Sequence, residues 1–322
     1  MKIYKLQQIN RLIRSSFLRN TVIWLAHVTR QRYLMVYFDP VLGCNLRCLS
    51  CYFSNEEKRK QLKGIIDKAD IKKLAHAIFG NTYKLQIGCG AEPTLYKYNP
   101  EIIRLGREYG VKYIAMTTNA NLLTEDDIIE LLEAGLDEIT ISIHGVTAHT
   151  YENLMRNASF DKLISALKAL TKVKADFPSF KLRLNYTINH LNIDELSDFF
   201  DVYGDFSTDI LQLRALRDIG GEIKEVKTDE LFYQKLNTVI LKLENECKSR
   251  NITFIKPDDF ERANEINDQK VEENPAYCYV SPKSFWKEDF DWRKETYRTY
   301  TKRTKYGLSL FKSIFKPHQS HE

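Results

Sequence analysis

From residue 33 onward the sequence alternates between short strand-like runs and amphipathic helical runs, and this alternation constrains the fold more than any other feature. The strand-like runs are rich in β-branched and aromatic residues, which favour extended structure. Strands that alternate with helices of this length are joined by right-handed crossovers, so they lie parallel in one sheet. The predicted strands are residues 33–38, 84–88, 111–117, 138–143, 180–188 and 209–216, and the predicted helices are residues 67–79, 100–110, 124–135, 159–175 and 192–204.

Six such units in a row predict an α/β fold, and a partial (β/α)6 barrel of the TIM type more than a doubly wound sheet, although periodicity alone does not separate the two. A helix at 229–251 and a strand at 252–256 would add one further unit. The predicted N-caps are Thr124, Ser159 and Asn192, and the predicted helix stops are Gly110, Gly135 and Gly204.

The alternation divides the chain into three parts. Residues 1–32 predict an N-terminal amphipathic helical segment that packs on the outside of the domain, with contact to a membrane or a partner as the alternative. Residues 33–256 form the predicted core barrel. Residues 257–322 are predicted to be an α-rich, aromatic and basic C-terminal extension, which serves as a lid or a substrate element. Contact of this tail with a protein, a nucleic acid or a membrane surface is the alternative.

The bulk composition excludes several classes of protein. The 322 residues are 43% hydrophobic and carry a net charge of +5, which is too mild to indicate a nucleic-acid partner. No apolar run approaches the length of a transmembrane span, and none reads as a secretory signal. We therefore expect a cytoplasmic protein, in which clustered cysteines bind metal or act as thiols rather than form disulfides.

Three of the six cysteines, Cys44, Cys48 and Cys51, lie within eight residues, directly after the first predicted strand. Chemistry in a parallel α/β fold is expected on the loops that follow the carboxyl ends of strands. A structural zinc site usually needs four protein ligands, and no second cysteine pair follows downstream. Three thiolates without a fourth suit a four-iron, four-sulfur cluster that keeps one iron open.

The CxxxCxxC spacing after the first strand resembles the signature of the radical S-adenosylmethionine (SAM) superfamily. That resemblance implies a 4Fe–4S cluster held by the three cysteines and a SAM molecule chelated to the fourth iron. It further implies that one electron from the cluster cleaves SAM to a 5′-deoxyadenosyl radical, which abstracts hydrogen from a substrate. An electron donor such as flavodoxin or ferredoxin, and a small-molecule or peptide substrate, are the expected partners.

Further motifs extend the resemblance to about two thirds of the chain. "GCGAEPTL" (88–95) is similar to the family's glycine-rich turn, and Glu92 would offer its carboxylate to the amino group of SAM. Ser50 stands where the family usually has an aromatic residue against the adenine, so another wall, with Leu216 as one guess, must replace it. The cofactor-binding residues that the resemblance implies are Gly90, Glu92, Pro93, Asn119, Ser142, Arg156 and Leu216.

Two other functions remain open from the sequence. In one, the three cysteines hold zinc in a binding module whose basic tail contacts nucleic acid or protein. In the other, the chain keeps the cluster for electron transfer or sensing, without radical chemistry. The identity of the substrate does not follow from the motifs, because one fold hosts many reactions.

Overall fold

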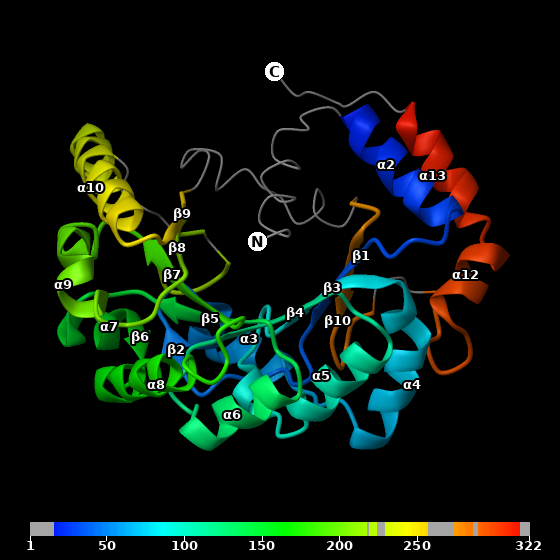
Figure 1. The fold of residues 1–322 in the computed structure, drawn as a ribbon, viewed down its shortest axis with the longest axis horizontal. Coiled ribbons are helices and arrows are strands. Elements are labelled where there is room, and N and C mark those ends of the chain that lie inside the picture. The colour runs from blue at the N-terminus through cyan, green and yellow to red at the C-terminus, as the bar shows by residue number, and fades with distance from the viewer. Residues whose placement is uncertain (1–15, 218, 224–228, 257–273, 286–288, 316–322) are drawn as a thin grey trace.

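One sheet of eight parallel strands organises the chain (Figure 1). The computed structural model describes residues 16–217, 219–223, 229–256, 274–285 and 289–315. The strand order is β10-β1-β3-β4-β5-β7-β8-β9, and the two edge strands do not pair with each other, so the sheet is an open barrel. The strands are β1 (Leu34–Phe38), β3 (Thr82–Ile87), β4 (Tyr113–Thr118), β5 (Glu138–Ile143), β7 (Lys181–Ile188), β8 (Ile210–Ala215), β9 (Thr253–Ile255) and β10 (Tyr277–Val280). The predicted α/β class and open barrel are confirmed.

Helices that follow the strands cover one face of this sheet, and Figure 1 shows α4, α5, α6 and α8 side by side along it. The helices are α2 (Ser16–Val28), α3 (Glu56–Gln61), α4 (Lys68–Ile78), α5 (Asn99–Glu108), α6 (Glu125–Glu133), α7 (Ala148–Leu154), α8 (Phe160–Val173), α9 (Phe199–Tyr203), α10 (Glu230–Ser249), α12 (Tyr297–Arg303) and α13 (Tyr306–Ile314). Short 3-10 turns are η1 (Tyr52–Ser54), η2 (Phe79–Asn81), η3 (Pro93–Leu95) and η4 (Leu196–Asp198). A separate two-stranded ladder joins β2 (Arg47–Cys48) to β6 (Met155–Arg156).

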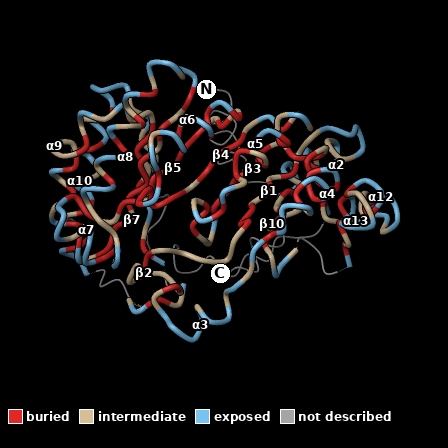
Figure 2. Tube along the Cα trace, turned by 90° about the horizontal axis from the view of Figure 1, so that it is seen from below, coloured by how far each residue is buried: buried red, intermediate tan, exposed pale blue. Residues whose placement is uncertain are grey.

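The side chains of the strands alternate between an apolar face under the helices and a polar face without described helices. On β1, Leu34, Val36 and Phe38 are fully buried, whereas Tyr37 is half-buried and is in register with Gln86 of β3. Successive residues of a strand point to opposite faces, so one residue in two contributes to the core. In Figure 2 the buried trace follows the strands and the exposed trace follows the outer turns of the helices.

Several predicted helix ends are confirmed by the conformation of their capping residues. Thr124 accepts from the backbone of Asp127 in a capping box, and Gly110 and Gly135 adopt positive φ at the stops. Asn192 is not an N-cap, and that prediction is wrong. Its side chain instead donates to the carbonyls of His144 and Thr187, so the helical segment begins later, at η4.

The two ends of the chain return to the core. The predicted N-terminal helix is present as α2, while residues 1–15 lie outside the described residues. Residues beyond 273 supply an unpredicted strand, β10, which pairs in parallel with β1, and two helices, α12 and α13. The proposed role of residues 257–322 as a lid stays a prediction. In the described part of the chain, no helix combines the length and the apolar character needed to cross a bilayer.

Asp209 joins α8, β7 and β8 at the amino ends of the strands. It accepts from Lys174, from Lys181 at 2.8 Å and from the backbone of Leu182 at 2.9 Å. Burial raises the pKa of this carboxyl, but the lysine and backbone bonds outweigh burial and hold the pKa below its ordinary value. The ionised form is therefore the one that stabilises the fold.

We predict that Asp209→Asn lowers the free energy of unfolding at neutral pH by roughly 1–3 kcal/mol. A carboxyl whose pKa falls on folding contributes stability above its unfolded pKa of about 3.9, and that contribution disappears as pH falls through the folded value. The difference between variant and wild type should therefore vanish in strong acid. Urea unfolding at several pH values measures it, and a pH-independent difference would contradict this role.

Candidate active site

The cysteine loop, residues 43–51, follows β1 at the carboxyl end of the sheet. Cys44, Cys48 and Cys51 are free and half-buried. The loop is held by the pairing of β2 with β6 and by the backbone N–H of Cys51, which donates to the carbonyl of Cys48 at 2.9 Å. The side chain of Arg47 donates to the carbonyl of Cys44 at 2.8 Å. The thiols are thus presented by an ordered backbone.

The three thiols are held in the protonated form by their surroundings. Burial raises the pKa of Cys44 to about 12; the backbone N–H of Leu46 opposes this, and Glu92 and Cys51 add to it. Burial, and after it the neighbouring thiols Cys44 and Cys51, raises the pKa of Cys48. A thiolate is the form that binds metal, so binding here must displace protons with a strong cationic centre.

The number of thiols in the loop distinguishes the two kinds of metal site. Cys44, Cys48 and Cys51 provide three ligands. A structural zinc site usually takes four protein ligands, whereas a four-iron cluster can be held by three thiolates with one iron left open. The loop therefore suits such a cluster better than it suits structural zinc.

A buried carboxylate that the sequence did not single out, Asp39, shapes the glycine-rich turn after β3. It accepts from the backbone N–H of Cys89 at 2.7 Å and of Gly90 at 3.0 Å, and from the hydroxyl of Tyr279 on β10 at 2.8 Å. A Cβ on Gly90 would stand 2.5 Å from the hydroxyl of Tyr52. A larger residue at position 90 would therefore displace the Tyr52 hydroxyl, which donates to the carbonyl of Gly90. The position of Asp39, directly after the first strand, was the available signal.

Glu92 is the second buried carboxylate, and its oxygens accept four hydrogen bonds. Thr94 donates from its backbone at 3.1 Å and its hydroxyl at 2.7 Å, and Thr118 donates from its hydroxyl at 2.6 Å. The backbone N–H of Asn119 donates to the other oxygen at 2.9 Å. Glu92 also donates its own N–H to the carbonyl of Gly43 at 2.8 Å. It thereby joins the loops after β1, β3 and β4.

Asn119 links the hydrogen bonds of Glu92 to the cysteine loop. Its side-chain amide donates to the oxygen of Asn45 at 2.9 Å and lies 3.9 Å from the sulfur of Cys44. Its oxygen accepts from the backbone of Asn121 at 3.0 Å. Gly90, Glu92 and Asn119 are therefore brought together around the cysteine loop, and their contact with a cofactor stays a prediction.

The other predicted cofactor residues are placed differently. Pro93 is buried and opens η3, and Ser142 is half-buried on the polar face of the sheet, in register with Asn185. Leu216 is buried after β8. Arg156 lies on β6 rather than on a helix, is exposed, and pairs with Glu222 at 2.6 Å.

A short segment after β8, residues 221–223, lies against the cysteine loop. No sequence motif predicted this contact. The backbone N–H groups of Glu222 and Ile223 donate to the carbonyl of Leu49 at 2.7 and 3.1 Å. A Cβ on Gly221 would overlap the carbonyl of Leu49 and stand 2.7 Å from the nitrogen of Cys51. Glycine is needed here because two backbones touch.

The polar face of the sheet holds a second unpredicted group. Glu138 pairs with Arg183 at 2.9 Å and accepts from the hydroxyl of Tyr113 at 2.6 Å. Arg183 also donates to Gln212 at 2.9 Å. Lys84 is buried on the same face, where burial and then Arg183 lower its pKa to about 8. Cationic side chains thus exceed acidic ones here.

The sequence model of the Radical SAM superfamily matches residues 39–202, half of the chain. This range begins at Asp39 and contains the cysteine loop, the glycine-rich turn and Asn119. The chain belongs to the radical SAM superfamily. The 4Fe–4S cluster and SAM are the cofactors of this family, and the three thiols of Cys44, Cys48 and Cys51 fit such a cluster. The predicted family and cofactors are confirmed.

Individual relatives extend the comparison. A "Probable GTP 3',8-cyclase" of Saccharolobus solfataricus is 30% identical over 190 residues, which are 59% of this chain and 59% of the relative. The chain thus spans only 59% of the length of such curated relatives. SuiB of Streptococcus suis bound to SAM has a TM-score of 0.60 at 18% identity, over 82% of this chain and 63% of SuiB. The structure titled "Native anSMEcpe with bound AdoMet and Cp18Cys peptide" has a TM-score of 0.58 at 17% identity, over 89% of this chain and 84% of that one. These two likenesses concern the fold.

We predict that Gly221→Ala loosens the cysteine loop, because the added methyl group would overlap the backbone of Leu49 and Ser50 and force the two segments apart. The reconstituted protein should retain several-fold less iron after gel filtration than the wild type. Gly80→Ala is the matched control, since no atom lies within 4 Å of the Cβ it would gain. Equal iron retention by both variants would contradict the contact.

We predict that Glu92→Gln destabilises the cofactor-free protein by about 1–3 kcal/mol, since the amide group would face a backbone or hydroxyl donor. Arg156→Gln is the comparison. Its surface ion pair with Glu222 should contribute no more than about 0.5 kcal/mol. Urea unfolding of both variants measures this, and equal losses of stability would show that Glu92 does not join the loops.

Proposed function

We propose that the chain holds a 4Fe–4S cluster through Cys44, Cys48 and Cys51 and cleaves SAM reductively to a 5′-deoxyadenosyl radical, which abstracts hydrogen from a substrate. The observation that carries this proposal is the cysteine loop and the hydrogen bonds that hold it in place. Three clustered thiols stand on a backbone that Glu92 and Asn119 join to the neighbouring strands by hydrogen bonds. The cofactors supply the redox chemistry, and the protein supplies position.

The residues of the chain then have separate tasks. Asp39 and Glu92 hold the turn between them, so that Gly90 and Pro93 present a fixed backbone to SAM. Glu92 would then have two roles. It accepts four hydrogen bonds that hold the loops together, and its negative charge would also attract the amino group of SAM. Arg156 can bind the carboxylate of SAM only if it first releases Glu222, its present ion-pair partner. Ser142 and Leu216 remain proposed walls of the SAM site.

The polar face of the sheet favours an anionic substrate. Lys84 has no carboxylate partner among the described side chains, and Glu138 neutralises Arg183 alone. Asn185, buried on the same face, has a side-chain oxygen without a described partner. The name of the Saccharolobus solfataricus relative specifies GTP, an anion, for that protein. A small molecule or peptide that bears carboxylate or phosphate groups suits this face best.

The reaction also needs a reductant and a reducing compartment. We infer a flavodoxin or ferredoxin as the electron donor, because the potential of a SAM-cleaving cluster lies at the low end of the range that protein clusters span. The cytoplasm provides the reducing conditions in which free thiols persist. The zinc-binding module is the less favoured function, since three thiols fall one short of the four protein ligands that a structural zinc site usually needs.

Anaerobic reconstitution with iron and sulfide, followed by dithionite and SAM, tests this function. The wild type should release 5′-deoxyadenosine, whereas Cys44→Ala, Cys48→Ala and Cys51→Ala should each lose iron and reduce its release by at least about a hundredfold. Cys247→Ala is the matched control, because Cys247 is buried on α10, away from the cysteine loop. A fully loaded protein that releases no 5′-deoxyadenosine would refute the proposal.

A further inference from the structure

Two helices that are far apart in the sequence, α2 and α13, pack against each other beside the sheet. Figure 1 shows α2 and α13 lying against one another, apart from the helices that cover the strands. Trp24 packs on Phe311 at 5.2 Å between ring centres, and Phe17 on Phe315 at 6.2 Å. Ile23 and Leu310 are buried with Ala276 in a small apolar cluster. The pair is therefore an ordered part of the fold.

Both helices also carry apolar side chains on the side that faces solvent. These residues recur every three or four positions, so they form a stripe along each helix. The stripes adjoin, because Phe311 and Phe315 of one helix contact Trp24 and Phe17 of the other. We name this surface the α2–α13 face. Its exposed residues, from 40% to 65% accessible, are Phe17, Leu18, Val22, Leu25, Val28, Leu308, Phe311 and Phe315.

Such a continuous exposed apolar surface indicates an interaction site. Residues 16–32 and 296–315 contain no Asp or Glu, and Glu295 and Asp289, just outside these ranges, pair with Arg303. The basic residues in these two ranges are Arg19, Arg30, Arg32, Arg298, Lys302, Arg303, Lys305 and Lys312. An apolar stripe with basic flanks is the pattern of helices that lie in the interface of an anionic membrane.

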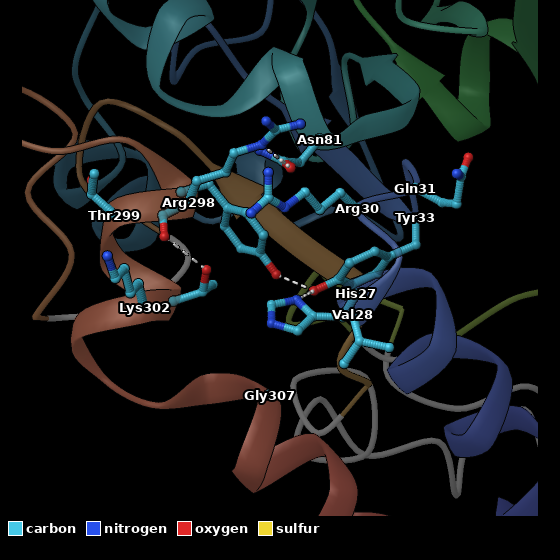
Figure 3. Close-up of a pocket in the computed structure, with 12 residues that line it drawn as sticks. His27, Val28, Arg30, Gln31, Tyr33, Asn81, Arg298, Thr299, Lys302 and Gly307 are labelled. Atoms are coloured by element: carbon cyan, nitrogen blue, oxygen red, sulfur yellow. Dashed lines mark hydrogen bonds between the residues drawn. The ribbon is translucent and has the colours of Figure 1, made fainter.

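A cationic pocket adjoins this face (Figure 3). Its volume is about 510 Å³, and Val28 belongs both to the pocket lining and to the α2–α13 face. Arg30, Arg298 and Lys302 line it, and no carboxylate does. Arg298 donates to Asn81 at 3.4 Å, and neither Arg30 nor Lys302 has an ion-pair partner among the described residues.

Hydrogen bonds join the elements around the pocket, which is separate from the cysteine loop. The hydroxyl of Tyr33 bonds to His27 at 3.0 Å and to the hydroxyl of Tyr297, which joins α2, the start of β1 and α12. Tyr33 and Asn81 precede β1 and β3, so the pocket lies at the amino ends of these strands. The cysteine loop follows the carboxyl end of β1, at the opposite edge of the sheet.

We propose that the α2–α13 face rests on an anionic phospholipid surface and that the adjoining pocket takes a lipid phosphate. A free phosphate ligand would account for the pocket but leave the apolar stripe exposed. Another copy of this chain would bring like-charged basic residues together. A bilayer surface provides acyl chains for the stripe and phosphates for the arginines and lysine at once. This binding is independent of SAM cleavage.

Vesicle flotation with the full chain tests the proposal, using vesicles of phosphatidylcholine alone and of phosphatidylcholine mixed with phosphatidylglycerol. The wild type should float with the mixed vesicles and not with the neutral ones. Val22→Glu/Leu25→Glu should weaken partitioning by about tenfold or more, because it places charge in the acyl region. Arg298→Gln/Lys302→Gln should weaken it several-fold and reduce its dependence on salt.

Control variants on α10 distinguish binding through the α2–α13 face from nonspecific binding to vesicles. Leu241→Glu and Lys242→Gln/Lys248→Gln change equally exposed residues and should leave partitioning within about twofold of the wild type. Circular dichroism confirms that each variant folds. Three results would overturn the proposal: no flotation, flotation equal with neutral vesicles, or a dimer in light scattering that Val22→Glu/Leu25→Glu abolishes without any vesicle binding. Stabilisation by inorganic phosphate without flotation would likewise assign the pocket to a free anion.

Discussion

The carboxylate of Glu92 holds together loops that the chain places far apart. It accepts donors from the turn after β3 and from the loop after β4, while its backbone donates to Gly43 in the cysteine loop. A buried carboxylate is costly unless its oxygens are satisfied, and here four donors satisfy them. The position of the thiols relative to the sheet follows from this one junction, because Asn119 transmits it to Cys44 and Asn45.

Asp39 performs a parallel task at the edge of the sheet. It fixes the backbone of the glycine-rich turn and receives the hydroxyl of Tyr279 from β10, so the C-terminal part of the chain contributes to the same edge. The segment with Gly221 closes over the cysteine loop from the other side. Three regions that are distant in the sequence therefore converge where the family's cofactors bind.

Much of this arrangement follows from sequence patterns, and the remainder depends on contacts that patterns do not record. The strands from β1 to β9 that form the sheet have strong β-branched runs, and the three cysteines have a spacing that few other sites share. β10 is short and lies beyond the last helix–strand unit, so only its pairing with β1 reveals it. Asn192 looked like a cap because caps are local, yet its amide bonds to distant carbonyls. Arg156 was assigned to SAM by position in a motif, and the structure shows its ion pair with Glu222.

The central claim is that three cysteines leave one iron of the cluster free for SAM. Electron paramagnetic resonance of the anaerobically reconstituted, dithionite-reduced protein tests it most directly, with spectra recorded before and after SAM is added. We predict the signal of a reduced four-iron cluster whose g values change on addition of SAM, because SAM becomes a ligand of the free iron. A signal from a fully loaded cluster that SAM leaves unchanged would contradict the claim.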